Sequence, residues 1–364
     1  MIDAWLLIST LVWLFLHLAF AGWGRGHRLE RDGQGKGSVR VCVPARDEAA
    51  NIAACVRAVL ADPRVTELVV VDDGSTDGTR EHAIAAAAGD ARCFVRVAEE
   101  RPAGWLGKPW ACTAAAIGAE TDWLLFLDAD VAVAPGAVGA TIERAERERA
   151  DFASLFGTWE VVSFWERLCI PAFGWLIRSV VDLRAVNGGT RAFANGQYLL
   201  VRRTAYQALG GHGVVRGEIL DDVRFAQRAR EAGLVGRLWW APWAFRVRLY
   251  RDLGEIVAGY RKNLHEGLGR NKGVTIGASF GVLATTALPV LAAVAFVALG
   301  DGARAAWASV VVLLGVLLRV RLELRDGRSA AIALLHPVAG AIIALVLLLS
   351  IAPGAWKGRA LTRP

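Results

Sequence analysis

Residues 68–79 read LVVVDDGSTDGT, an apolar run that ends in two adjacent aspartates and a glycine-rich turn. Similar short apolar runs occur at 40–43, 93–97 and 123–127, and alanine-rich stretches typical of helices lie between them, at 49–60, 77–88 and 109–119. Strands that alternate with helices of this length predict βαβ units and a mostly parallel sheet. We therefore expect an α/β, Rossmann-like fold that binds its ligand beyond the carboxyl ends of the strands.

The turn that follows the second strand has a simple structural explanation and a functional one. Ser75 or Asp77 can cap the helix that begins there, because side-chain oxygens accept the first free N–H groups of a helix. Capping does not explain the adjacent pair Asp72 and Asp73 at the end of a buried strand. This pair is therefore a candidate ligand contact.

The fourth strand ends in a second acidic group, Asp128-Ala129-Asp130. Two carboxylates at i and i+2 on an extended chain point the same way and can bind one hard cation such as Mg²⁺ or Mn²⁺. Taken alone, this spacing is more often an ordinary turn. The two interpretations remain open at this point.

The two ends of the chain are strongly apolar. Apolar residues make up 54% of the chain, and stretches with no formal charge occupy 5–23, 273–300, 305–318 and 329–356. A helix of about 20 residues crosses the hydrocarbon core. We expect a membrane anchor at 1–24, for which a cleaved signal peptide is the alternative, and two or three transmembrane helices within 273–356.

The charges of the chain give its expected orientation. The formal net charge is +7, and only five of the 42 basic residues are lysines. Arginines gather after residue 23, before residue 273 and around residues 319–328, which places the middle part, 38–271, in the cytoplasm of a multi-pass inner-membrane protein. No nucleic-acid-binding motif accompanies the basic charge, so we expect no nucleic-acid partner.

The order and spacing of these groups resemble a known family. The strings VPARDE at 43–48, VDDGSTDGT at 71–79, GKPWA at 107–111 and LDAD at 127–130 are similar to the nucleotide-sugar half of family 2 glycosyltransferases, which have the GT-A fold. PAGWLGKPWA at 102–111 and the terminal apolar segments look like the hopanoid-associated and carotenoid glycosyltransferase subgroup. Ceramide glucosyltransferases are more distant. The likeness covers about residues 38–270.

The resemblance implies a nucleotide-sugar half at 38–150 and an acceptor half at 151–271. In the first half, Asp73, together with Asp72, would accept hydrogen bonds from uracil and ribose. The resemblance implies that Pro44, Arg46 and Glu48 line the same pocket.

The resemblance also implies a divalent metal, Mg²⁺ or Mn²⁺. Asp130 would hold it, with Asp128 beside it and near the ribose. Lys108 is a second expected cation, either for the phosphates or for the carboxylates of the metal site; a plain surface lysine is the alternative.

In the acceptor half, the acidic pair Asp221 and Asp222 fits the family's position for the catalytic base, with Asp222 as the general base. The alternative is a cluster that caps a helix. His212 is open between a ligand contact and a buried structural histidine. The family's Gln/Arg-x-x-Arg-Trp string is missing, and Arg261 or Lys262 could reach the diphosphate instead.

Aromatic residues are frequent between residues 159 and 181 and again at Trp239, Trp240 and Trp243. Such a segment is either a core helix or a helix in the membrane interface. We favour the interface, because the acceptor would be reached from the bilayer.

Together these features predict a membrane-bound, inverting, metal-dependent glycosyltransferase. It would transfer a single sugar from a nucleotide-sugar, with UDP as the expected nucleotide, to a lipid such as a hopanoid or carotenoid. The alternatives are a polyprenyl-phosphate sugar synthase and a non-catalytic membrane scaffold with a transferase fold. The sequence does not specify the sugar or the lipid, because pocket shape sets both.

Overall fold

The computed structural model describes residues 1–31, 33–352, 355–356 and 359–360. The described chain divides into two compact units. The sheet unit consists of Gly24–Glu160 and Asp182–Leu249. The helical unit consists of Met1–Trp23, Val161–Val181 and the described residues from Tyr250 to Ala360. Segment 161–181, expected within the acceptor half, is thus part of the helical unit.

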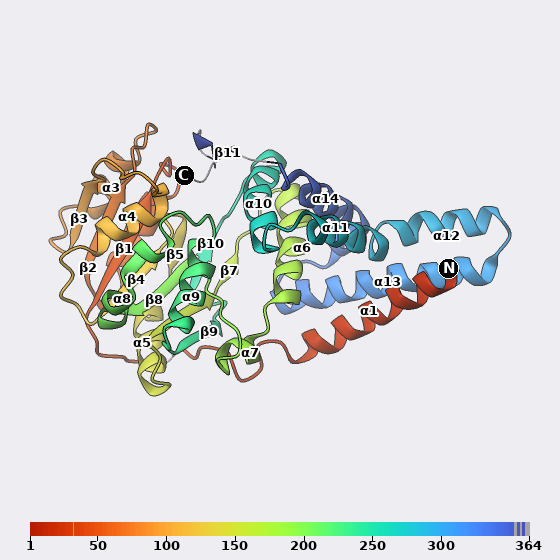
Figure 1. Ribbon diagram of the computed structural model, residues 1–364, viewed down its shortest axis with the longest axis horizontal. Helices are drawn as coiled ribbons and strands as arrows, with labels where there is room; N and C mark the ends of the chain where they lie inside the picture. The colour runs from red at the N-terminus through yellow and green to blue at the C-terminus, as the bar shows by residue number, and fades with distance from the viewer. Residues whose placement is uncertain (32, 353–354, 357–358, 361–364) are drawn as a thin grey trace. The chain divides into compact units, whose positions relative to one another are not determined.

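The sheet unit is built on a seven-stranded sheet with the order β3-β2-β1-β4-β8-β6-β9 (Figure 1). The first four of these strands are parallel, β8 runs antiparallel to both of its neighbours, and β9 is parallel to β6. The strands are β1 Val39–Ala45, β2 Val65–Asp72, β3 Cys93–Val97, β4 Trp123–Leu127, β6 Phe152–Phe156, β8 Tyr198–Arg202 and β9 Gly236–Trp240. The expected mostly parallel α/β fold is confirmed.

Helices and a smaller sheet complete this unit. The small sheet has the order β5-β10-β7. Its strands are Val131–Val133, Phe245–Val247 and Thr158–Trp159. The helices are α2 Ile52–Leu60, α3 Thr79–Ala87, α4 Gly107–Ala116, α5 Ala137–Arg147, α7 Leu183–Asn187, α8 Arg203–Leu209, the 3₁₀ helix η1 Gly211–Val215 and α9 Asp221–Glu231.

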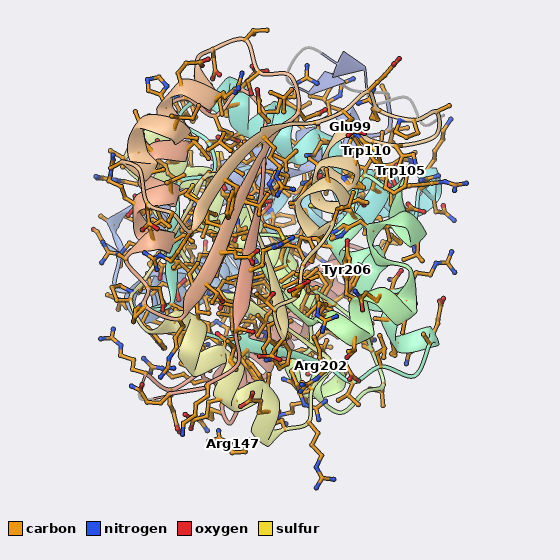
Figure 2. The ribbon with its side chains drawn as sticks, turned by 90° about the vertical axis from the view of Figure 1, so that its left-hand side faces the viewer. Glu99, Trp105, Trp110, Arg147, Arg202 and Tyr206 are labelled. Carbon is orange, nitrogen blue, oxygen red and sulfur yellow. The ribbon has the colours of Figure 1, made fainter. Side chains whose placement is uncertain are left out.

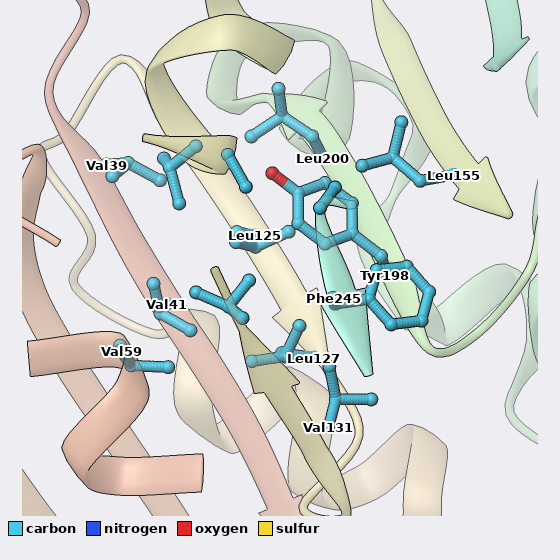
Figure 3. Packing of buried hydrophobic residues seen from close by; sticks show 14 of the residues in the cluster. Val39, Val41, Val59, Leu125, Leu127, Val131, Leu155, Tyr198, Leu200 and Phe245 are labelled. Carbon is cyan, nitrogen blue, oxygen red and sulfur yellow. The ribbon is translucent and has the colours of Figure 1, made fainter. Parts of the chain in front are cut away.

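The central strand β4 is buried on both faces, which explains why it is continuously apolar rather than alternating. One hydrophobic cluster contains Val41, Leu125, Tyr198 and Phe245, which Figure 3 shows packed between the two sheets. A second cluster contains Cys42, the next residue along β1, whose side chain faces the other way. The parallel strands therefore end at a common edge that the core holds rigid.

The helical unit contains the apolar ends of the chain. Three helical segments are long and apolar enough to cross a membrane, Ile2–Gly22, Gly302–Arg325 and Ala331–Leu349, and a fourth span results if the bent pair Lys272–Thr285 and Leu288–Ala298 counts as one. The helices are α1 Ile2–Gly22, α6 Phe164–Val180, α10 Leu253–Gly267, α11 Lys272–Thr285, α12 Leu288–Ala298, α13 Gly302–Arg325, η2 Ala331–Leu335 and α14 His336–Leu349; β11 Ala355–Trp356 and β12 Arg359–Ala360 follow. Residues 353–354 of the expected last segment lie outside the described residues.

Two segments of this unit are longer or more buried than the sequence suggested. The apolar stretch at 305–318 lies in a helix that continues to Arg325, and Arg319, the residue after the stretch, is buried. Arg319 is 2% exposed, forms an ion pair with Glu323 one turn later, and donates to the Arg167 carbonyl oxygen of α6 at 3.0 Å. The ion pair with Glu323 offsets the cost of burying the Arg319 guanidinium, so the helix continues beyond the apolar stretch.

The aromatic segment 161–181 is mainly a core element. α6 begins after Ser163, whose hydroxyl caps it, and the middle part of α6 is buried. There the rings of Phe173 and Tyr260 stack with their centroids 3.7 Å apart. Only Phe164 and Trp165 in its first turn are exposed among its aromatic side chains. Trp239, expected on the same aromatic surface, is fully buried in the sheet unit.

Candidate active site

The loops that follow β1 and β2 are joined by hydrogen bonds at the carboxyl edge of the sheet. The Thr76 N–H donates to Asp47 Oδ1 at 2.9 Å, and the Glu48 N–H donates to Thr79 Oγ1 at 2.7 Å. Asp77 accepts from the Ala49 N–H at 2.9 Å. The polar residues of this turn therefore hold the two loops together.

The adjacent aspartates have different surroundings. Asp72 is 6% exposed and its Oδ1 accepts from the backbone N–H and the hydroxyl of Ser75, so it shapes the turn. Asp73 lies 3.9 Å from a guanidinium nitrogen of Arg46. Burial raises the pKa of Asp73, and the charges of Arg46 and Arg101 oppose that rise. Of the two, Asp73 is the better placed for a ligand contact.

Arg101 was missed by the sequence analysis. It belongs to the loop between β3 and α4, residues 98–106, whose far end is fixed by the Leu106 N–H donating to the Arg216 carbonyl at 2.7 Å. The rings of Trp105 and Trp110 meet edge to face with centroids 5.3 Å apart, and Trp110 Nε1 donates to the Glu99 carbonyl (Figure 2). The loop is thus held at both ends beside the site, which a local sequence pattern does not reveal.

Asp128-Ala129-Asp130 forms a turn rather than an extended segment. The Val131 N–H donates to the Asp128 carbonyl at 3.1 Å, which is the ordinary turn that the sequence had left open beside a cation site. Asp128 Oδ1 pairs with Lys108 Nζ at 2.7 Å. In contrast, Asp130 Oδ1 is buried and has no hydrogen-bond partner among the described residues.

The surroundings of Asp130 fit a cation. Burial raises the pKa of Asp130 well above its usual value, and the negative charges of Asp128 and Glu48 add to the rise. Within the described part of the chain, no three Asp, Glu, His or Cys side chains gather closely enough to hold a metal by themselves. Mg²⁺ and ions like it commonly take only one or two protein carboxylates and complete their shell with substrate phosphates and water. Asp130, with Asp128 next to it, fits that kind of site.

Lys108 lies close to the carboxylate of Asp128 after β4 and to those of Asp221 and Asp222 at the start of α9. It is in the first turn of α4, and burial of its ammonium would lower its pKa, but the charges of Asp128, Asp221 and Asp222 together raise that pKa well above the usual value. A Cβ built on Gly196 would lie 3.0 Å from both Lys108 Nζ and Asp222 Oδ2. The two charged groups therefore border the same small space, and Lys108 is not an isolated surface lysine.

Asp222 is held by backbone donors at both oxygens. Its Oδ2 accepts from the Gly196 N–H at 2.6 Å and its Oδ1 from the Val223 N–H at 2.8 Å. Burial raises the pKa of Asp222, while Lys108 and the two N–H groups oppose the rise. Asp221 and Asp222 do begin a helix, α9, as the capping interpretation requires, but Asp222 also reaches outside its own helix. A fixed carboxylate with a raised pKa suits a general base.

His212 is a structural residue. It is 2% exposed, its Nδ1 lies 3.0 Å from the Tyr206 hydroxyl, and its ring packs against Phe126 and Phe225. Burial lowers the pKa of His212 to about 3, so it is neutral at physiological pH. Of the two interpretations that the sequence left open, the packing favours this one.

The remaining expected site residues are split between the units. Pro44 is a β1 residue paired with Val71, and Glu48 accepts from the Asn51 amide at 2.8 Å. Arg261 and Lys262 lie on α10 of the helical unit, so their expected contact with the diphosphate stays a prediction. Within the sheet unit, the contacts given above bring Arg46 close to Asp73. Separately, they connect Glu48, Lys108, Asp128, Asp130, Asp221 and Asp222.

Residues 40–210 match the sequence profile described as glycosyl transferase family 2. The matched residues contain β1 to β8, with the aspartates of the strand ends and Lys108.

Relatives of the chain have been named and solved. The 4,4'-diaponeurosporenoate glycosyltransferase of Staphylococcus aureus is 24% identical over 243 residues, which are 65% of this chain and 63% of that protein. The chain therefore matches somewhat less than two thirds of the length of this relative. A mannosyltransferase from Pyrobaculum calidifontis, solved with GDP-mannose and Mn²⁺, has a similar fold, with a TM-score of 0.55, 16% identity and coverage of 96% of this chain and 97% of the other.

Proposed function

We propose that the protein is a membrane-bound, inverting glycosyltransferase that transfers one sugar from a nucleotide-sugar to a lipid acceptor. The observation that carries the proposal is that Lys108 and Asp222 border the same small space at Gly196, with Lys108 also paired to Asp128. This arrangement connects a base on α9 to the acidic group after β4. It rests on side chains of the sheet unit alone.

On the donor side, Asp73 and Arg46 would bind the nucleoside, with uridine as the proposed base. Asp130 and Asp128 would hold a divalent cation, whose chemistry is to neutralise the charge that grows on the departing diphosphate. Lys108 adds a fixed positive charge beside the same carboxylates. The buried, unpartnered Oδ1 of Asp130 supports this assignment.

On the acceptor side, Asp222 would remove the proton from an acceptor hydroxyl as its oxygen forms the bond to the anomeric carbon. The bond from that carbon to the diphosphate breaks on the opposite face, so the configuration inverts. The two backbone N–H groups that bind Asp222 fix the direction of its free lone pairs. A carboxyl acceptor, already ionised, would need Asp222 only for positioning.

The acceptor is proposed to be an apolar lipid. The apolar helices of the helical unit support membrane attachment, and the named relative is a diaponeurosporenoate glycosyltransferase. The arginines that flank the apolar segments support an inner-membrane protein whose sheet unit lies in the cytoplasm.

The test is label transfer to lipid. Membranes that contain the full-length protein are incubated with a set of labelled nucleotide-sugars and Mn²⁺, and the lipids are extracted. We expect one lipid to acquire label, and Asp222→Asn and Asp130→Asn to abolish the transfer. Glu231→Gln is the matched control, because Glu231 is exposed on the same helix α9.

Two outcomes would redirect or reject the proposal. Full transfer by Asp222→Asn onto a polyprenyl phosphate would show a phosphate acceptor, which needs little base catalysis. No donor binding and no turnover with any nucleotide-sugar would leave only a membrane scaffold with this fold.

A further inference from the structure

A basic hollow of about 470 Å³ lies in the sheet unit and shares no lining residue with the candidate active site. Four arginines line it, two from the segment that follows α1 and two from the last turn of α5: Arg28, Arg31, Arg144 and Arg147. Glu30 is the one acidic residue among its described lining. Arg147 lies at the surface of the unit (Figure 2).

The segment that carries Arg28 is fixed to the edge of the large sheet. The Leu29 N–H donates to the Trp240 carbonyl at 3.0 Å, and the Trp240 N–H donates to the His27 carbonyl at 2.8 Å. These bonds add a short parallel bridge at the end of β9, the edge strand. Trp243 Nε1 also donates to the Leu29 carbonyl at 2.9 Å. The hollow is therefore a built feature rather than a chance gap beside a loose loop.

The tryptophans hold two guanidinium groups in place. The central carbon of Arg28 lies 5.3 Å from the Trp240 ring centroid, and that of Arg31 lies 5.5 Å from the Trp243 ring centroid. A guanidinium over an aromatic face keeps the N–H donors at its edge available. Neither of these arginines, nor Arg147, has a carboxylate partner among the residues that the structure describes.

Arg144 has a different part in the hollow. It pairs with Glu148 at 2.7 Å and donates to the Arg28 carbonyl at 2.6 Å. It therefore ties α5 to the segment after α1. The charge offered to a ligand comes from Arg28, Arg31 and Arg147.

We propose that this hollow binds the phosphate group of an anionic membrane lipid. Guanidinium groups match phosphate oxygens in geometry and charge, and three of them around one space, each without a carboxylate partner among the described residues, are typical of a phosphate site. Gly26, which also lines the hollow, follows the last residue of the candidate span α1 by only four residues, a reach of at most about 14 Å. Anionic lipid surfaces attract basic groups at this distance from a span. The proposal rests on α1 lying in the membrane and not on the transferase activity.

The test measures binding to the full-length protein in a neutral detergent. Soluble dioctanoyl phosphatidylglycerol, dioctanoyl phosphatidylcholine and inorganic phosphate are titrated separately and followed by native mass spectrometry. We expect the phosphatidylglycerol to bind most tightly and the zwitterionic lipid to bind weakly. The double variant Arg28→Gln/Arg31→Gln and the single variant Arg147→Gln should each weaken phosphatidylglycerol binding about fivefold to tenfold.

Arg80→Gln is the matched control, because Arg80 is an exposed arginine of α3 outside the hollow. Its binding should equal that of the unchanged protein. Equal phosphatidylglycerol binding by all the variants would overturn the proposal. Inorganic phosphate that binds as tightly as the lipid would overturn the lipid source and assign the hollow to a free phosphate compound. Unchanged sugar transfer by the arginine variants keeps this result separate from the proposed function.

Discussion

The substitution Gly196→Ala tests how closely the site is packed around Asp222. The new Cβ would lie 3.0 Å from Asp222 Oδ2 and 3.0 Å from Lys108 Nζ, whereas ordinary contacts begin at 3.4 Å. Gly196 does not adopt a left-handed conformation, so alanine adds no backbone strain. The carboxylate must therefore move by a few tenths of an ångström, which also weakens its 2.6 Å hydrogen bond from the Gly196 N–H.

The size of the effect follows from this displacement. A misplacement of about 1 Å between reacting groups costs roughly a hundredfold in rate, so a shift of this size should cost about tenfold. This corresponds to about 1.4 kcal/mol of lost transition-state stabilisation. We expect kcat to fall about tenfold and KM for the nucleotide-sugar to change by less than about twofold, since the nucleoside contacts are untouched.

The assay is the initial rate of label transfer to lipid, with the nucleotide-sugar varied at saturating acceptor. Gly217→Ala is the control, because its Cβ would meet nothing closer than the Gly104 carbonyl oxygen at 3.6 Å. Gly217→Ala should keep full activity. A folded Gly196→Ala protein with unchanged kcat would refute the reasoning that the position of Asp222 limits the reaction.

Three further predictions concern charge, metal and acid stability. Burial raises the pKa of Asp222 and the charge of Lys108 opposes the rise, so kcat should fall as the pH drops through that raised pKa. Lys108→Gln removes the opposing charge and should move this acid limb of the pH–rate profile to higher pH. An unmoved limb would argue against Asp222 as the base. Removal of divalent ions with EDTA should abolish transfer, and added Mn²⁺ should restore it. Asp130→Asn should raise the Mn²⁺ concentration that gives the half-maximal rate about tenfold or more. Activity of the unchanged protein in EDTA would exclude a requirement for the metal. His212 has a pKa of about 3 when folded and about 6.5 when unfolded, so only the unfolded chain takes up a proton between these values, which costs about 2 kcal/mol of stability at pH 5. The melting temperature of His212→Phe should therefore fall less between pH 7 and pH 5 than that of the unchanged protein. A thiol-reactive dye that reports exposure of the buried cysteines measures both melting temperatures.

The strands and crossover helices could be predicted closely because their sequence pattern has one physical cause. A strand buried on both faces, such as β4, is apolar throughout. The runs expected at 93–97 and 123–127 are β3 and β4 with the same bounds. The aspartates at the strand ends were found for the same reason, since a carboxylate directly after a buried strand stands out.

The rest of the site depends on contacts between distant parts of the chain. Nothing near Gly196 in the sequence shows that its N–H binds a carboxylate 26 residues later. The charge of Arg101 acts on Asp73 across the turn of a loop that long-range hydrogen bonds hold in place. Whether the residues from Asp128 to Asp130 form a turn was left open by the sequence, because a hydrogen bond from residue i+3 leaves no mark in residue type. In the helical unit, the i, i+4 spacing of Arg319 and Glu323 was visible and could have predicted a longer α13.

The cross-bonded loops after β1 and β2 have a consequence for redesign. Asp47, Glu48 and Ala49 each exchange a hydrogen bond with the segment Ser75–Thr79, so the two segments behave as one mechanical part. Grafting one of them from a transferase with another nucleotide preference would leave several hydrogen-bond donors and acceptors without partners and would destabilise the recipient. Both segments would have to be exchanged together, and evolution of a new preference faces the same requirement of paired change.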